Sequence, residues 1–95
     1  MFYFRFEATP RHDAGVAPEA AGAFVSCWIE RSTLQEAVGV ARAAIEKQGW
    51  IVDEPEESRE VTLKDYPPRH DGREQFEQAL IDKEVFVFFT YPESE

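Results

Sequence analysis

Cysteine is nearly absent from this 95-residue sequence, in which Cys27 is the single example. One cysteine excludes an internal disulfide and fits a reducing compartment. The sequence also lacks any apolar run near the roughly 20 residues that a membrane-spanning helix needs. Its start has no basic region of the kind that opens a signal peptide. We therefore expect a cytoplasmic protein made of one domain, residues 1–95.

Positive charge is scarce, with 10 Lys and Arg residues against 19 Asp and Glu residues and a formal net charge of −9. Residues 49–95 hold thirteen acids and five bases, whereas residues 1–48 hold six acids and five bases. Such a surface repels phosphate backbones and anionic lipids, so we expect neither nucleic acid nor membrane as a partner. A basic protein is the kind of partner that this charge favours.

Familiar catalytic motifs are lacking as well. The sequence contains no phosphate-binding glycine loop, nucleophile elbow, CxxC or HExxH. Cys27 alternates with Val25 and Ile29, which predicts a buried structural thiol rather than a nucleophile. We therefore expect no cofactor and favour a protein that is not an enzyme.

The tetrapeptide PRHD occurs twice and holds the only two histidines. If the two loops meet, His12 and Asp13 with His70 and Asp71 would supply a divalent metal site or a histidine general base. The alternative is turn chemistry, because Pro starts turns, Asp caps helices and Gly follows closely. We favour turns and expect no metal, since neighbouring His and Asp side chains point apart in an extended chain.

Alternating apolar residues predict a strand over 1–8 and another over 23–30, separated by a long loop over 9–22. A helix is predicted after the second strand, because apolar residues recur there at helical spacing. Ser32 or Thr33 would cap its beginning, and Gly49 would end it. A strand begins at Trp50, and Pro55 predicts that it lies at an edge, bulges or turns back.

The last third of the chain is predicted to hold a short helix and a final strand. Asp71 is expected to cap the helix, which would bury Phe76, Ala79 and Leu80. EVFVFFTYP, residues 84–92, is apolar on both faces, a pattern typical of a central strand. The sequence therefore predicts an α+β two-layer sandwich, ferredoxin-like in style, with two helices on one face of a four- or five-stranded mixed or antiparallel sheet.

Two helices on one face would leave the other face uncovered. The pattern assigns to that face five aromatic residues: Tyr3, Phe24, Trp28, Phe86 and Phe88. A large exposed apolar patch usually marks an interface. We favour a homodimer through this face, while the alternatives are coverage by the 9–22 loop and, against the charge, stacking of nucleic-acid bases.

Five acids crowd the beginning of the second half of the chain, at Asp53, Glu54, Glu56, Glu57 and Glu60. It lacks the spacing and central glycine of an EF-hand. One hypothesis is that it binds a basic partner, as an immunity- or antitoxin-like inhibitor would. The simpler interpretation is a solvated edge strand whose charges prevent pairing with other chains.

Four segments, MFYFRFEA, GAFVSCWIE, EAVGVARAAIEKQGW and VFVFFTYP, together resemble a group of small bacterial proteins of uncharacterised function. The resemblance covers most of the chain and includes the GW pair that follows the first helix. It implies a small α+β fold and transfers no activity and no catalytic residues.

Overall fold

The computed structural model describes residues 1–10 and 20–92 and has the predicted α+β class. In chain order its elements are β1 (Phe2–Pro10), β2 (Ala20–Ile29), α1 (Leu34–Lys47), β3 (Trp50–Val52), β4 (Glu57–Glu60), a 3-10 turn (Leu63–Asp65), α2 (Arg73–Asp82) and β5 (Glu84–Pro92). β2 therefore begins inside the segment predicted as a loop. Neither described helix is long and apolar enough to cross a membrane.

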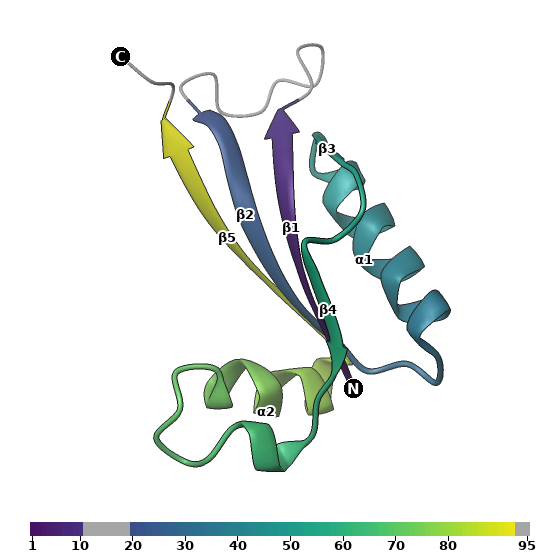
Figure 1. Ribbon diagram of the computed structural model, residues 1–95, viewed down its shortest axis with the longest axis vertical. Coiled ribbons are helices and arrows are strands. Elements are labelled where there is room, and N and C mark those ends of the chain that lie inside the picture. Colours follow the sequence, from purple (N-terminus) through teal and green to yellow (C-terminus); the bar gives the residue numbers. More distant parts are fainter. Residues whose placement is uncertain (11–19, 93–95) are drawn as a thin grey trace.

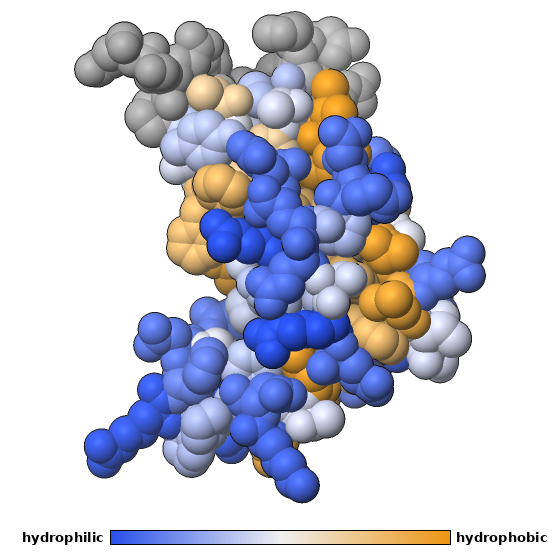
Figure 2. Space-filling view, viewed as in Figure 1, coloured by the Kyte–Doolittle hydropathy of each residue, from blue (hydrophilic) through white to orange (hydrophobic). Residues whose placement is uncertain are grey.

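The strands form one open antiparallel sheet in the order β3-β1-β2-β5, and β4 pairs with β1 as well (Figure 1). β3 pairs with the end of β1 near Pro10, and β4 pairs with its beginning near Phe2, so both occupy the same edge. Pro55 lies between them, and the predicted edge position is confirmed. Figure 2 shows hydrophilic residues over β4 along this edge.

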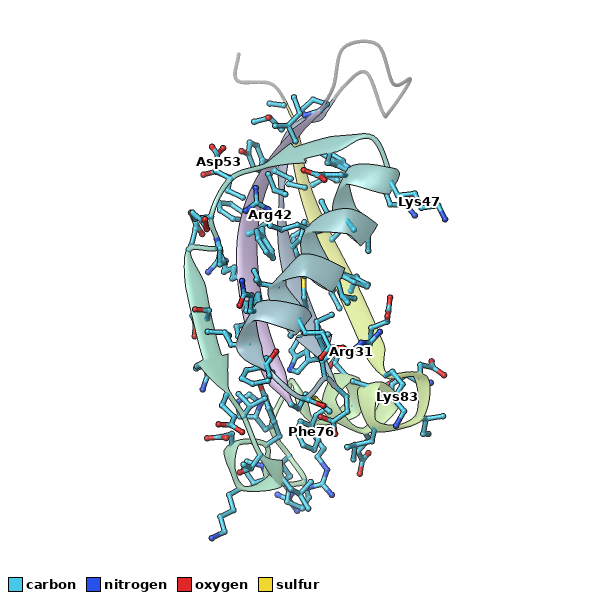
Figure 3. All side chains as sticks on the ribbon, turned by 90° about the vertical axis from the view of Figure 1, so that its right-hand side faces the viewer. Arg31, Arg42, Lys47, Asp53, Phe76 and Lys83 are labelled. Atoms are coloured by element: carbon cyan, nitrogen blue, oxygen red, sulfur yellow. The ribbon has the colours of Figure 1, made fainter. Side chains whose placement is uncertain are left out.

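Helix α1 packs across one face of the sheet, called the α1 face below (Figure 3). Thr33 is its N-cap, and the backbone N–H of Glu36 donates to the Thr33 hydroxyl at 3.1 Å. The helix ends at Lys47, and Gly49 follows with a φ of 95°, a left-handed conformation that glycine adopts without steric cost. Both predicted boundaries of this helix are confirmed.

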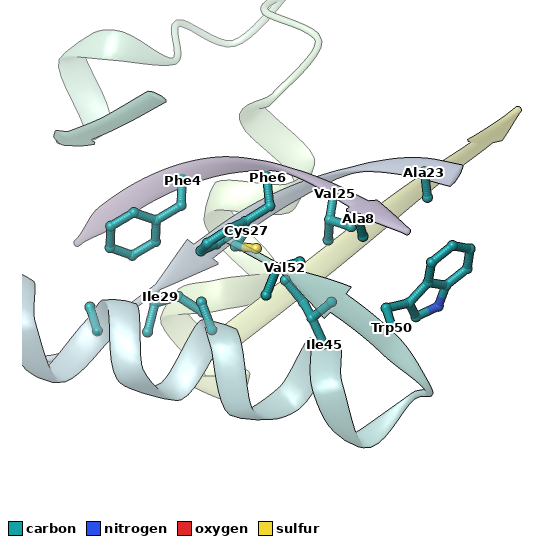
Figure 4. Packing of buried hydrophobic residues seen from close by; sticks show 12 residues of the cluster. Phe4, Phe6, Ala8, Ala23, Val25, Cys27, Ile29, Ile45, Trp50 and Val52 are labelled. Atoms are coloured by element: carbon teal, nitrogen blue, oxygen red, sulfur yellow. The ribbon is translucent and has the colours of Figure 1, made fainter. Parts of the chain in front are cut away.

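The main core fills the space between α1 and the sheet (Figure 4). Its strand residues alternate along β1 and β2, while Ala37, Ala41 and Ile45 recur at helical spacing on α1. The buried members of this core are Phe4, Phe6, Ala8, Ala23, Val25, Cys27, Ile29, Ala37, Ala41, Ile45, Trp50 and Val52. Small alanines on the helix allow it to approach the two phenylalanines of β1 closely.

Helix α2 packs on the opposite face, called the α2 face, near one end of the sheet (Figure 1). Phe76 and Ala79 of α2 form a second buried cluster with Trp28, whereas Cys27, its neighbour on β2, belongs to the α1 core. Adjacent strand residues point to opposite faces. The prediction of two helices on one face is therefore wrong, and the described elements do not show a ferredoxin-like topology.

The final strand also differs from its prediction. β5 pairs with β2 and is the last strand in the sheet order, so within one chain it lies at an edge and not at the centre. Its register sets Phe86 opposite Cys27 and Phe88 opposite Val25, so both phenylalanines lie on the α1 face. The grouping of Phe86 and Phe88 with the aromatic residues of the other face is wrong.

Candidate functional site

A hollow lies on the α2 face, between the sheet and the start of α2. Its volume is about 230 Å³. We call it the Trp28 pocket, and its lining residues are Tyr3, Ser26, Trp28, Arg59, Tyr66, His70, Asp71, Gly72, Gln75, Val87 and Phe89. A neighbouring hollow of about 330 Å³ shares Tyr3, Ser26 and Phe89 with it.

Four aromatic side chains give the pocket its walls. The ring centroids of Tyr3 and Trp28 lie 5.1 Å apart, and those of Trp28 and Tyr66 lie 6.5 Å apart in an edge-on arrangement. Trp28 and Tyr66 are almost fully buried, whereas Phe89 is 58% exposed at the mouth. The pocket is therefore a mainly apolar recess with one open side, as small-molecule sites commonly are.

A buried hydrogen bond holds two of these walls together. The indole N–H of Trp28 donates to the Tyr66 hydroxyl over 3.0 Å, and this bond joins β2 to the segment before α2. Burial raises the pKa of the Tyr66 hydroxyl above its ordinary value, although the bond from Trp28 acts in the opposite direction. Tyr66 therefore stays neutral near physiological pH and is a structural acceptor here.

Arginines lie over two partly buried rings of this face. The guanidinium carbon of Arg59 is 5.3 Å from the centre of the Tyr3 ring, and that of Arg5 is 4.6 Å from the centre of the Phe24 ring. Both arginines also pair with acids. Arg59 forms an ion pair with Glu57 of β4 at 2.9 Å, and Arg5 lies 3.8 Å from Glu56, the residue before β4. Their positive charge is therefore partly neutralised within the chain.

The second PRHD copy forms a turn that leads into α2. The backbone N–H of His70 donates to Pro67 O at 2.8 Å, and the N–H of Gly72 donates to the Nδ1 atom of His70 at 2.9 Å. This bond places the proton of the neutral imidazole on Nε2. Gly72 is the N-cap and has no side-chain cap, so the prediction that Asp71 caps this helix is wrong.

Pro10 of the first PRHD copy ends β1, but His12 and Asp13 lie outside the described residues, and so does most of the segment 9–22. Only His70 and Asp71 of the hypothetical metal or general-base site are placed, both at the rim of the Trp28 pocket. Within residues 1–10 and 20–92, no three His, Cys, Asp or Glu side chains gather as a metal site requires. The histidine-based enzyme stays a prediction.

Cys27 is buried in the core under α1, as its alternation with Val25 and Ile29 predicted. Burial raises the pKa of its thiol to about 12. A nucleophilic cysteine requires a thiolate near neutral pH and access for its substrate. Cys27 meets neither condition and is a core residue.

The predicted partner-binding acids lie along the edge formed by β3 and β4. Glu54 is 3.7 Å from Arg42 of α1, and the pairs of Glu56 and Glu57 with arginines are described above. Asp53 and Glu60 are exposed on the same edge, as Figure 3 shows for Asp53. This placement agrees with a charged edge, while binding of a basic partner stays a prediction.

The predicted interface aromatics are divided between the two faces. Tyr3, Phe24 and Trp28 lie on the α2 face, but α2 and the preceding turn bury Trp28. Sequence reasoning missed Arg59, Tyr66 and Gln75, which complete the pocket from distant parts of the chain. The one available signal was Tyr66 itself, an aromatic residue in an otherwise polar, proline-rich segment.

No protein-family model matches this chain, and comparison with curated proteins and with solved structures finds no match either. The resemblance to small bacterial proteins of uncharacterised function therefore stays a prediction.

Replacing Gly72 by alanine is expected to disturb the pocket. The new Cβ would lie 2.7 Å from Cε1 of the Tyr66 ring, which is buried and hydrogen-bonded and therefore has little room to move. We expect Gly72→Ala to lower the free energy of unfolding by about 1–3 kcal/mol, as overpacking does. Urea unfolding followed by tryptophan fluorescence measures the change.

Gly39→Ala is the matched control, because nothing lies within 4 Å of the added Cβ and the residue is inside α1. There we expect a gain of about 0.5–1 kcal/mol from helix propensity. Equal stabilities of the two variants would contradict the close packing of Tyr66 on Gly72.

Proposed function

We propose that this protein is a non-enzymatic domain that acts through protein contacts, and that its first partner is a second copy of itself. The proposal rests chiefly on one observation, the composition of the sheet edge formed by β5. In the described part of the chain, β5 pairs only with β2. Its other edge offers backbone N–H and C=O groups to a further strand.

Between its terminal residues, Glu84 and Pro92, β5 carries none of the usual features that keep an edge strand from pairing. Residues 85–91 contain no charge and no proline, and the five residues from Val85 to Phe89 are all apolar. Phe89 is 58% exposed, and Val85, Phe86, Val87 and Phe88 are only partly buried. A long apolar edge of this kind favours addition of another strand.

The opposite edge has the contrary properties. It is divided into β3 and β4, which span three and four residues and are separated by Pro55. All four residues of β4 are exposed, and three of them are charged. Short strands, proline and charge are the features by which proteins prevent edge pairing. The β3–β4 edge is therefore protected from pairing, and the β5 edge is the one open to a second copy.

Antiparallel pairing of β5 with β5 of a second copy around a two-fold axis would join two sheets into one. β5 would then lie at the centre of the combined sheet, where a strand that is apolar on both faces is expected. The charge distribution supports this arrangement. The acids of the β3–β4 edge lie at the other side of the sheet, and Glu84 of β5 is paired with Arg31 at 3.0 Å.

The proposal is tested by adding charge to β5 without disturbing the monomer. Phe89 and Thr90 are exposed and point to opposite faces, so a Phe89→Lys/Thr90→Lys variant should fold but place charges beside the paired edge. By analytical ultracentrifugation we expect twice the chain mass for the wild type and the mass of one chain for the variant. Far-ultraviolet circular dichroism confirms that the variant is folded.

Gln78→Lys/Ile81→Lys is the control, since it adds the same charge at exposed positions of α2. This variant should sediment as the wild type does. A wild-type protein that keeps the mass of one chain at high concentration would overturn the proposal, and so would dissociation of the α2 control.

A further inference from the structure

The Trp28 pocket has polar atoms that are satisfied within the chain and one that is not. The Trp28 indole N–H bonds the Tyr66 hydroxyl, and the hydroxyls of Tyr3 and Ser26 lie 3.1 Å apart, within hydrogen-bonding distance. Gln75 differs, because its side-chain carbonyl oxygen is buried and has no hydrogen-bond partner. In the described part of the chain it is the only buried side-chain nitrogen or oxygen of which this is true.

A buried carbonyl without a donor is unfavourable, and native proteins contain few of them. Gln75 lies in the first turn of α2 and lines the Trp28 pocket, and it also lines a smaller hollow beside Gln78 and Val85. A ligand that fills the pocket and donates one N–H to this oxygen would satisfy it. A ligand without an N–H donor would displace water from the pocket and leave the Gln75 oxygen without a hydrogen bond.

The walls and the charges define the rest of the ligand. Rings of Tyr3, Trp28 and Phe89 favour a flat apolar body, and about 230 Å³ is below the roughly 300–1,000 Å³ typical for drug-sized molecules. Arg59 is already paired with Glu57 at 2.9 Å, and Asp71 also lines the pocket. The site therefore does not require a charged ligand.

We propose that the Trp28 pocket binds a small, neutral, planar heteroaromatic molecule of one or two rings, whose ring N–H donates to the side-chain oxygen of Gln75. The site lies on the α2 face and its key residue is on α2, so the proposal does not depend on pairing of β5 between two copies.

Indole and benzofuran are suitable probes, because they have similar shape and only indole has the N–H donor. We would titrate ¹⁵N-labelled protein with each and follow the side-chain N–H signals of Trp28 and Trp50. Trp50 is an internal control, since it belongs to the core on the α1 face. We expect both probes to shift the Trp28 signal and leave Trp50 unchanged, with benzofuran binding about tenfold more weakly, as loss of one hydrogen bond to a buried group implies.

Gln75→Leu should remove the preference for indole, whereas Gln78→Leu, a similar change on the same helix outside the Trp28 pocket, should retain it. The Trp50 signal also reports whether each variant is folded. Equal affinity of the wild type for the two probes would overturn the proposal. Equal shifts at both tryptophans, or no shift at saturating indole, would do so as well.

Discussion

Ile45→Ala is expected to lower the free energy of unfolding by about 2–5 kcal/mol, the range for large-to-small changes in a close-packed core. Ile45 is fully buried between α1 and the sheet, in the same cluster as Cys27 and Val52. A domain of this size has a total stability of about 5–14 kcal/mol. The variant should therefore unfold at a much lower urea concentration, which circular dichroism measures directly.

Ile81→Ala makes the same chemical change in the other helix, where the side chain is 73% exposed. Because little apolar surface is lost there and alanine is a good helix former, we expect a change within about 0.5 kcal/mol. Both variants should be compared at one protein concentration, since association adds concentration-dependent stability. Similar destabilisation by the two changes would show that α1 does not cover the main core.

Alkaline pH is expected to destabilise the fold through Cys27. Its thiol has a pKa of about 12 in the folded protein against an ordinary value of 9.0. Below the ordinary value both states are protonated and the stabilisation is complete. As pH rises, the unfolded chain releases the proton first, so stability falls by about 1.4 kcal/mol per pH unit until the folded thiol ionises. Between about pH 8 and pH 11 the expected loss is roughly 3 kcal/mol.

Cys27→Ala isolates this contribution. The variant should be less stable at neutral pH because of the smaller side chain, but it should lose roughly 3 kcal/mol less than the wild type over the same pH interval. The raised pKa of Tyr91, caused first by its hydrogen bond to Glu7, and that of Tyr66 act in both proteins alike. Parallel stability curves for the two proteins would contradict a thiol that is protonated and buried.

Much of the fold could be predicted because its signals are local. Alternation along residues 2–8 and 23–29, the Thr33 cap and Gly49 defined β1, β2 and α1, and Pro55 indicated the edge. The faces of β5 could not be assigned in this way. A strand that is apolar on both sides carries no period-two signal, and a shift of one residue moves every side chain to the other face. The placement of α2 was a separate expectation, taken from the two-layer arrangement of α+β domains, and it was wrong because α2 packs on Trp28 at the other face.

The Trp28 pocket could not be predicted for a different reason. Trp28 and Tyr66 are 38 positions apart, and the bond between them joins β2 to the segment before α2, so no local pattern contains it. Asp71 was a reasonable cap from its spacing, but the Arg73 N–H, which an Asp71 cap could bind, donates to the His70 carbonyl oxygen at 3.1 Å, and α2 begins one residue later. Competition between neighbouring acceptors of this kind is decided by turn geometry, which the sequence pattern does not contain.

The prediction of a central position for β5 is wrong for a single chain. Its pattern predicts a central strand, and within one chain it is an edge strand. In the dimer that we propose, β5 would be central in the combined sheet, as its apolar pattern predicts. The apolar β5 edge would then serve to pair two copies, and the charged β3–β4 edge would prevent further pairing.

The most direct test of this account is an isotope-filtered NOE experiment on an equal mixture of ¹³C,¹⁵N-labelled and unlabelled chains. The account predicts cross-strand contacts between backbone protons of β5 in one copy and β5 in the other, together with slow exchange of the β5 amides that face the partner. If no such contacts appear at high concentration and these amides exchange freely, β5 is an unpaired edge and the proposed dimer is wrong.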